Sequence, residues 1–90
     1  MNQINDTIRD TLEKEGYTGT ISDMLSAWLL STGATGDNIN DLWKSYFDTN
    51  LIPAGQFNNR MFTWLKSESA VGKSLNDLKL DYWQKRLAFP

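Results

Sequence analysis

Apolar residues recur along this chain in a pattern that repeats every 18 residues. The triplets Ile21-Ser22-Asp23, Ile39-Asn40-Asp41, Phe57-Asn58-Asn59 and Leu75-Asn76-Asp77 stand 18 residues apart, and Ile4-Asn5-Asp6 precedes the first of them by 17. Self-similarity at a fixed period is the signature of a repeat architecture. The chain therefore contains five units, and we define the first residue of each triplet as position zero of its unit.

The residues four, seven and eight places after position zero are also mostly apolar. Eighteen of the twenty residues at positions zero, four, seven and eight are apolar or aromatic, and the exceptions are Thr11 and Lys79. This spacing places side chains on one face of an α-helix. We predict helices over about 4–15, 21–32, 39–49, 57–68 and 75–87, with all four tryptophans on their inner faces.

Polar residues mark where these helices begin. Capping residues (Thr20, Asn38, Ser74) precede position zero, and an aspartate follows three residues after each cap (Asp23, Asp41, Asp77). The cap oxygen accepts a first-turn N–H, while the carboxylate can reach back to the backbone of the cap. Gln3 with Asp6 and Gln56 with Asn59 are predicted as weaker versions of this start.

The helices are predicted to end at residues that tolerate a left-handed backbone, namely Gly16, Gly33 and Asn50. The connections between helices are then only about five to seven residues long, so sequential helices pack against one another. We predict a single all-α domain over residues 1–90, in which five short capped helices form a compact helical bundle. A small helical-repeat array, left open at both ends, is the alternative.

Composition and charge exclude several kinds of catalytic site, metal site and partner. The 90 residues include no cysteine and no histidine, which excludes Ser-His-Asp and Cys-His nucleophiles as well as imidazole and thiolate zinc sites. The net charge of −2 argues against nucleic acid as a partner. The longest apolar run, Ala27-Trp28-Leu29-Leu30, is too short for a membrane span, and the start of the chain does not resemble a secretory signal.

Candidate catalytic chemistry is limited to carboxylates. Asp6 and Asp10 lie four residues apart and could in principle serve a small carboxylate-dependent hydrolase. Helix capping accounts better for Asp6, because an aspartate recurs at the same place in other units. Gly36–Asp41 has oxygen ligands but lacks the glutamate of a calcium loop. We therefore predict no catalytic residue, no metal site and no cofactor.

A second apolar surface is predicted from residues outside the repeated face. One place after position four, the five units read Arg9, Ser26, Lys44, Phe62 and Leu80, so only the last two are apolar. Ile52 and Phe89 add to this set. An exposed apolar patch on a small protein usually marks a partner. Ile52, Phe62, Leu80 and Phe89 are therefore the predicted partner-binding residues, and burial in a closed core is the alternative.

The segments Glu15-Gly16-Tyr17-Thr18-Gly19-Thr20-Ile21-Ser22-Asp23-Met24-Leu25 and Gly36-Asp37-Asn38-Ile39-Asn40-Asp41-Leu42 resemble a repeat of tailed-bacteriophage virion proteins. That repeat reads approximately G-Y-T-G-S-[IL]-N-D, and the resemblance covers almost the whole chain. The third and fourth connections, around Pro53-Ala54-Gly55 and Val71-Gly72-Lys73, lack its tyrosine and threonine.

The resemblance implies a non-enzymatic structural or accessory part of a phage particle, made in the host cytoplasm and located in the virion. It would decorate the capsid or join the tail, and its partners would be capsid or tail proteins. The resemblance does not determine whether the protein forms a homo-oligomer. The alternative is a small cytoplasmic adaptor that binds another protein, with neither nucleic acid nor membrane as a partner in either case.

Overall fold

The computed structural model describes residues 2–89 and contains helices without strands over that range. The helices are α1 (Gln3–Lys14), α2 (Ile21–Ser31), α3 (Ile39–Thr49), α4 (Phe57–Ser67) and α5 (Leu75–Ala88). Every boundary lies within one residue of its prediction. The all-α prediction is confirmed, and each unit of the repeat corresponds to one helix and the loop that follows it.

Reciprocal caps hold the starts of α2 and α5. The Thr20 hydroxyl accepts the Asp23 N–H at 3.1 Å, and the Asp23 carboxylate accepts the Thr20 N–H at 3.2 Å. Ser74 and Asp77 repeat this arrangement at 3.1 and 3.4 Å. Each pair satisfies two backbone N–H groups that would otherwise lack a partner at the helix terminus.

The other three helix starts differ in detail. Asn38 accepts the Asp41 N–H at 2.9 Å as predicted, but Asp41 receives the side-chain amide of Asn38 instead of its backbone N–H. The prediction for Gln3 is wrong, because α1 is capped by Asn2, whose shorter side chain reaches the first-turn N–H groups. Gln56 makes no side-chain cap bond.

The first four helices end in the same turn. A left-handed residue stands at position twelve of each unit, with φ of +99° at Gly16, +97° at Gly33, +61° at Leu51 and +67° at Ser69. The N–H groups of positions twelve and thirteen bond to the carbonyls of positions nine and eight, which is a Schellman motif. The predictions for Gly16 and Gly33 are confirmed. The prediction for Asn50 is wrong by one residue, because Asn50 has a φ of −87° and Leu51 takes the left-handed conformation.

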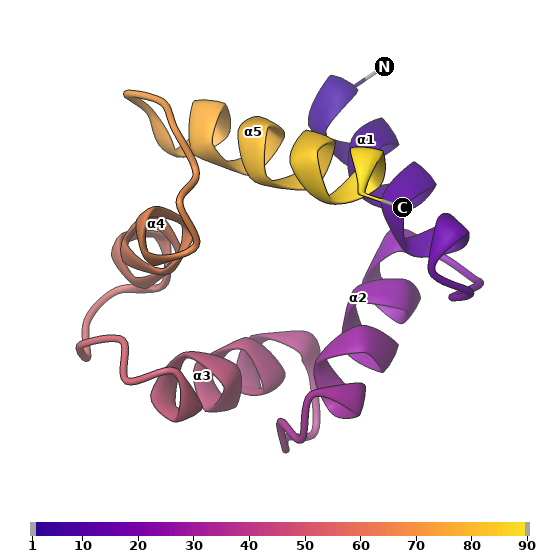
Figure 1. Ribbon diagram of the computed structural model, residues 1–90. Helices are drawn as coiled ribbons and strands as arrows, with labels where there is room; N and C mark the ends of the chain where they lie inside the picture. Colours follow the sequence, from indigo (N-terminus) through magenta and orange to yellow (C-terminus); the bar gives the residue numbers. More distant parts are fainter. Residues whose placement is uncertain (1, 90) are drawn as a thin grey trace.

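The five helices form a closed ring. In Figure 1 they follow one another around the ring in chain order, and α5 returns to lie beside α1. The contact between α1 and α5, which we call the seam, is the most extensive helix contact, whereas α3 and α4 share the least. The observed arrangement is therefore the closed bundle rather than the open array, with dimensions of 31 × 30 × 26 Å.

Aromatic side chains fill the middle of the ring. All four tryptophans are at least 92% buried, as predicted for the inner faces of α2 to α5. Trp28 lies 5.8 Å from Trp43 and 5.9 Å from Trp83, and Trp43 lies 5.6 Å from Trp64, measured between ring centroids. Edge-to-face contacts of this kind add to the free energy gained by burying the rings.

Thr11, one of the two exceptions in the repeat, lies in the seam. Its side chain is fully buried, and its hydroxyl lies 2.7 Å from the Thr7 carbonyl and 3.2 Å from the Trp83 carbonyl. The second of these contacts joins α1 to α5. A polar residue at this inward position therefore forms part of the ring closure.

None of the helices in residues 2–89 is both long enough and apolar enough to cross a bilayer.

Candidate functional site

The structure separates the four predicted partner-binding residues. Ile52 is only 7% exposed and belongs to the core, so its predicted place on an exposed surface is corrected. Phe62 and Leu80 are half-buried, and Phe62 packs against the core. Phe89 is 74% exposed. Of the four, only Phe89 presents most of its side chain to a partner.

The burial of Ile52 follows from the Schellman turn. In this motif an apolar residue at the second place after the cap commonly packs back onto the last turn of the helix. Position thirteen holds that residue in each of the first four units, which read Tyr17, Ala34, Ile52 and Ala70. Three of them, Ala34, Ile52 and Ala70, are buried. The recurrence of apolar residues at this offset is a sequence signal for their burial.

Phe89 stands at the edge of a cavity with a volume of about 590 Å³. We call it the seam cavity, because it opens where the ends of α1 and α5 meet the loop that follows α4. Its lining consists of Lys14, Glu15, Glu68, Ala70, Tyr82, Lys85, Arg86 and Phe89. The size lies within the range of ligand and side-chain binding pockets.

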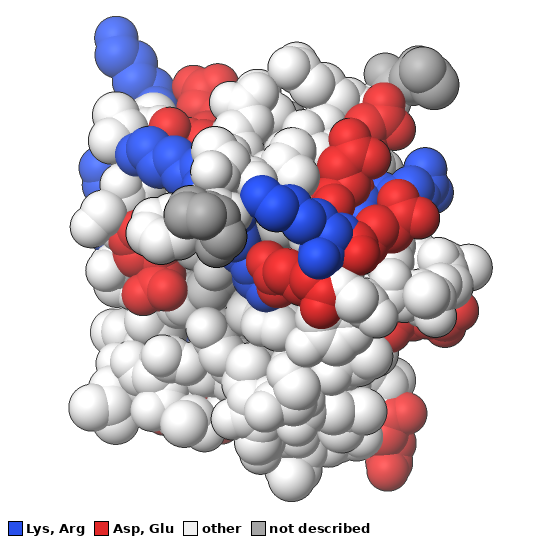
Figure 2. Space-filling view, turned by 45° about the vertical axis from the view of Figure 1, so that its right-hand side comes forward, with Lys and Arg blue, Asp and Glu red and all other residues white. Residues whose placement is uncertain are grey.

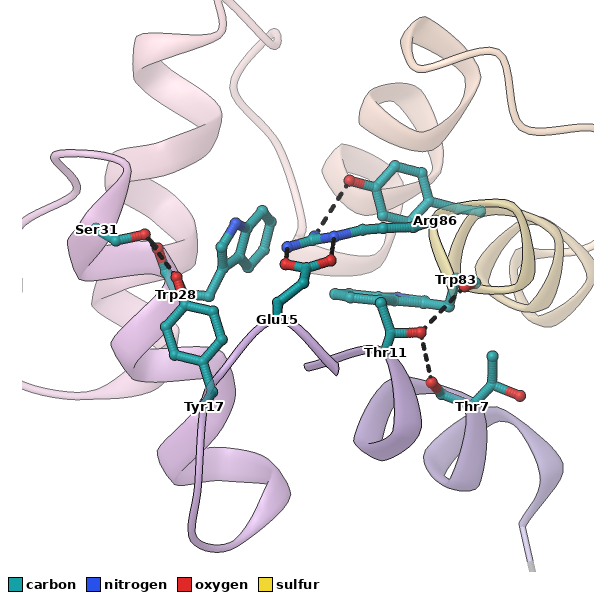
Figure 3. A network of polar contacts seen from close by, with 9 residues as sticks. Thr7, Thr11, Glu15, Tyr17, Trp28, Ser31, Trp83 and Arg86 are labelled. Carbon is teal, nitrogen blue, oxygen red and sulfur yellow. Dashed lines mark hydrogen bonds and ion pairs between the residues drawn. The ribbon is translucent and has the colours of Figure 1, made fainter. Parts of the chain in front are cut away.

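Arg86 forms the polar centre of this cavity (Figure 3). Its guanidinium makes a two-pronged ion pair with the Glu15 carboxylate at 2.5 and 2.7 Å, across 71 residues of sequence. The same guanidinium lies over Trp28 and Trp83, at 4.4 and 4.9 Å from their ring centroids. Such stacking combines cation–π attraction with desolvation of the charge.

The protonation of this group is fixed. Burial alone would lower the pKa of Arg86, but hydrogen bonds and attraction from Glu15, together with Tyr82, outweigh it and raise the pKa above its usual value. Arg86 is therefore always charged and already occupied by Glu15. It acts as an anchor between α1 and α5 and cannot exchange protons with a substrate at neutral pH.

Two tyrosines near Arg86 are also held in one protonation state. Burial raises the pKa of the Tyr46 hydroxyl to about 12, and Tyr82 and Glu68 add to this effect. Burial likewise raises the pKa of Tyr82, although Arg86 opposes it. Both hydroxyls remain protonated at neutral pH, so neither can act as a base there.

The lysines of the seam cavity have structural partners. Lys14 Nζ donates to the carbonyls of Leu87 and Phe89 at 2.7 and 2.8 Å, which fixes the end of α5 against α1. Lys85 pairs with Asp81 at 2.8 Å. The Glu68 side chain makes no hydrogen bond or ion pair within residues 2–89. As far as the described residues go, the cavity thus presents the Glu68 carboxylate and the Phe89 ring to an incoming molecule.

Sequence reasoning did not identify Glu15 and Arg86. Both occupy position eleven of their units, the first and the last, and they carry opposite charges. In a chain whose ends meet, opposite charges at the same repeat position of the terminal units are a recognisable signal.

The acidic candidates lie elsewhere. Asp6 is in the first turn of α1, and Asp10 is an exposed residue one turn later. Neither lines the seam cavity. Asp41 of the segment Gly36–Asp41 is engaged in the cap of α3. Within residues 2–89, no group of three acidic side chains is placed to hold a metal ion.

Charge is divided unevenly over the face of the molecule that Figure 2 shows. In Figure 2 blue and red side chains intermingle in the upper part of the view, while the lower part is nearly free of charge. The lower part lies at the height of α3 and the end of α2 in Figure 1. For α2 and the loop after it the sequence agrees, because no charged residue occurs between Asp23 and Asp37.

Comparisons of the chain with protein-family models, curated proteins and solved structures find no match.

Proposed function

We propose that this protein is a non-enzymatic structural or accessory component of a tailed-phage particle, located in the virion, where it binds a capsid or tail protein. One observation carries the proposal: the residues that resemble the phage repeat are used to build the scaffold. Thr20 and Asp23 cap α2, Asn38 and Asp41 cap α3, and Gly16 ends α1. The repeated acidic residues thereby have a structural role, which favours a scaffold over an enzyme.

The docking surface in this proposal is the rim of the seam cavity around Phe89. A phenylalanine with 74% of its surface exposed beside a cavity of about 590 Å³ offers an apolar anchor next to a recess. Aromatic anchors beside pockets commonly dominate the binding energy of protein interfaces. The Glu68 carboxylate at the same cavity, which has no bonded partner within residues 2–89, favours a partner that brings a basic side chain.

The test is mass spectrometry of density-purified particles of the phage or prophage that encodes the chain. A virion component co-purifies with assembled particles in many copies. Absence of the chain from the particles would contradict the proposal, and recovery of the chain in the lysate with one other protein would instead identify an adaptor.

A pair of variants tests the docking surface. Phe89→Ser removes the exposed ring and should strongly reduce incorporation into particles without changing the melting temperature. Leu51→Ser is the matched control, because Leu51 is 88% exposed and does not line the seam cavity. Equal incorporation of the two variants would place the docking surface elsewhere.

A further inference from the structure

A second cavity, of about 200 Å³, lies where all five helices converge. Its lining includes position four of every unit, namely Ile8, Leu25, Trp43, Met61 and Lys79. We call it the Lys79 pocket. Because the same repeat position contributes from each helix, the pocket is a product of ring closure and would not exist in an open array.

Lys79 is the second exception in the repeat and, among residues 2–89, the only charged residue that lines this pocket. The four other position-four residues are apolar, and Asn5 is the only further polar side chain in the lining. Lys79 thus brings a cationic side chain to a lining that otherwise consists of isoleucine, leucine, methionine, phenylalanine, tryptophan and one asparagine. The fifth unit has a lysine where the other four units have an apolar residue, and this substitution gives the pocket its charge.

The ammonium group of Lys79 has no bonded partner among the described residues. Within residues 2–89 its side chain makes no hydrogen bond or ion pair, although it is half-buried. Lys14 and Lys85 differ, since Lys14 donates to two carbonyls and Lys85 pairs with Asp81. None of the residues that line the Lys79 pocket is acidic. A half-buried lysine that has no bonded partner in this range and lines an apolar pocket favours an anion that brings an apolar group with it.

We propose that the Lys79 pocket binds an apolar carboxylate, with the apolar group inside the pocket and the carboxylate on the Lys79 ammonium. The volume limits the apolar part, because a cavity of about 150 Å³ holds one benzene molecule. The pocket, at about 200 Å³, therefore accepts a group slightly larger than one aromatic ring. The same chemistry is carried by a small free acid or by the end of a polypeptide that terminates in an aromatic residue. Binding here is independent of the virion proposal.

The experiment uses the full chain and three probes that share one aromatic group. These are 3-phenylpropionate, the neutral alcohol 3-phenylpropan-1-ol, and N-acetylphenylalanine, which mimics a polypeptide terminus. Binding is followed by calorimetry and by the NMR signals of the indole N–H groups of Trp43 and Trp83, which line the pocket. We expect at least one carboxylate to bind about tenfold or more tightly than the alcohol, since only a carboxylate forms a charge-assisted bond with Lys79. The tighter of the two carboxylates identifies the source.

The decisive variant is Lys79→Met. Methionine occupies position four of the preceding unit at Met61, so the substitution follows the pattern of the repeat and should leave the fold intact. We expect it to abolish the preference for carboxylate while the alcohol still binds. Lys73→Met is the control, because it removes the same charge from an exposed residue that does not line the pocket.

Three results would overturn the proposal. One is no binding of either carboxylate, and another is equal binding of carboxylate and alcohol to the unmodified chain. The third is a carboxylate preference that persists in Lys79→Met or disappears equally in Lys73→Met. None of these results bears on particle incorporation, so the two proposals can fail separately.

Discussion

The seam between α1 and α5 differs from the junction between α3 and α4, although both are contacts between neighbours in one ring. The seam has the most extensive helix packing and no connecting loop, whereas the junction has the least packing and is joined by the chain. An arginine braces each of them, buried in the case of Arg60 and half-buried in the case of Arg86. Arg86 reaches across 71 residues to Glu15, while Arg60 contacts Asp48, only 12 residues away, at 2.6 Å.

The difference shows how a ring of short helices is closed. At the junction the loop already holds the two helices together, so Arg60 mainly secures the loop through the carbonyls of Ile52 and Pro53. At the seam no covalent link exists, and closure depends on side chains with specific partners. Thr11, Lys14 and Arg86 supply these contacts.

The largest expected effect is at the seam. Arg86→Met should lower the free energy of unfolding by roughly 2–4 kcal/mol, because it removes both the two-pronged ion pair with Glu15 and the stacking on Trp28 and Trp83. Urea denaturation measures the change. Arg9→Met, an exposed substitution on α1, is the control and should be nearly neutral. A loss at Arg86 no greater than at Arg9 would show that the seam closes by apolar packing alone.

At the junction a smaller loss is expected. Arg60→Met should cost roughly 1–2 kcal/mol, because two backbone carbonyls lose their donor. Asp48 remains hydrated, since its side chain is 61% exposed. The effect should also be local, so hydrogen exchange should accelerate mainly in the loop of residues 50–56. Lys66→Met on the same helix is the exposed control. Global acceleration of exchange would mean that both arginines act on the whole ring.

The smallest effect concerns the backbone of the junction. Leu51 holds a left-handed conformation at 88% exposure, so Leu51→Gly relieves strain and removes little packing. It should raise stability by about 0.5 kcal/mol, because the relief of roughly 1 kcal/mol or more is partly offset by the entropy of glycine. The reverse change, Gly33→Ala, should destabilise by about 1 kcal/mol. Thermal unfolding of both variants tests the pair, and a loss of stability in Leu51→Gly would reveal packing by the Leu51 side chain.

Local features of this fold follow from the sequence, and long-range ones do not. The helices and the caps at Thr20 and Ser74 are predicted because each depends on residues within one turn. The left-handed conformation of Leu51 and Ser69 was not predicted, because glycine is the usual sequence signal for it and neither position holds glycine. The Schellman turn requires this conformation at position twelve whatever the residue. Ile52 is buried because of the same turn, which packs the residue after Leu51 against the end of α3.

The candidate sites also depend on long-range contacts, which the sequence pattern does not predict. Exposure of Phe89 is consistent with its prediction as a partner-binding residue, which remains to be tested. The pair of Glu15 and Arg86 could not be found from helix periodicity, because periodicity describes each unit and says nothing of which units meet. Lys79 was recognised only as an exception to the pattern, since its surroundings come from four other helices.

The seam also fixes how many repeats this architecture can hold. An open solenoid grows or shrinks by whole units, and it needs special end repeats to cover its exposed faces. Here the first and last helices cover each other, so the ring needs no such ends. A sixth unit of 18 residues would move α5 away from α1 and separate Glu15 from Arg86. Duplication of a unit is tolerated in a solenoid but would open this ring. The fold therefore requires five repeat units.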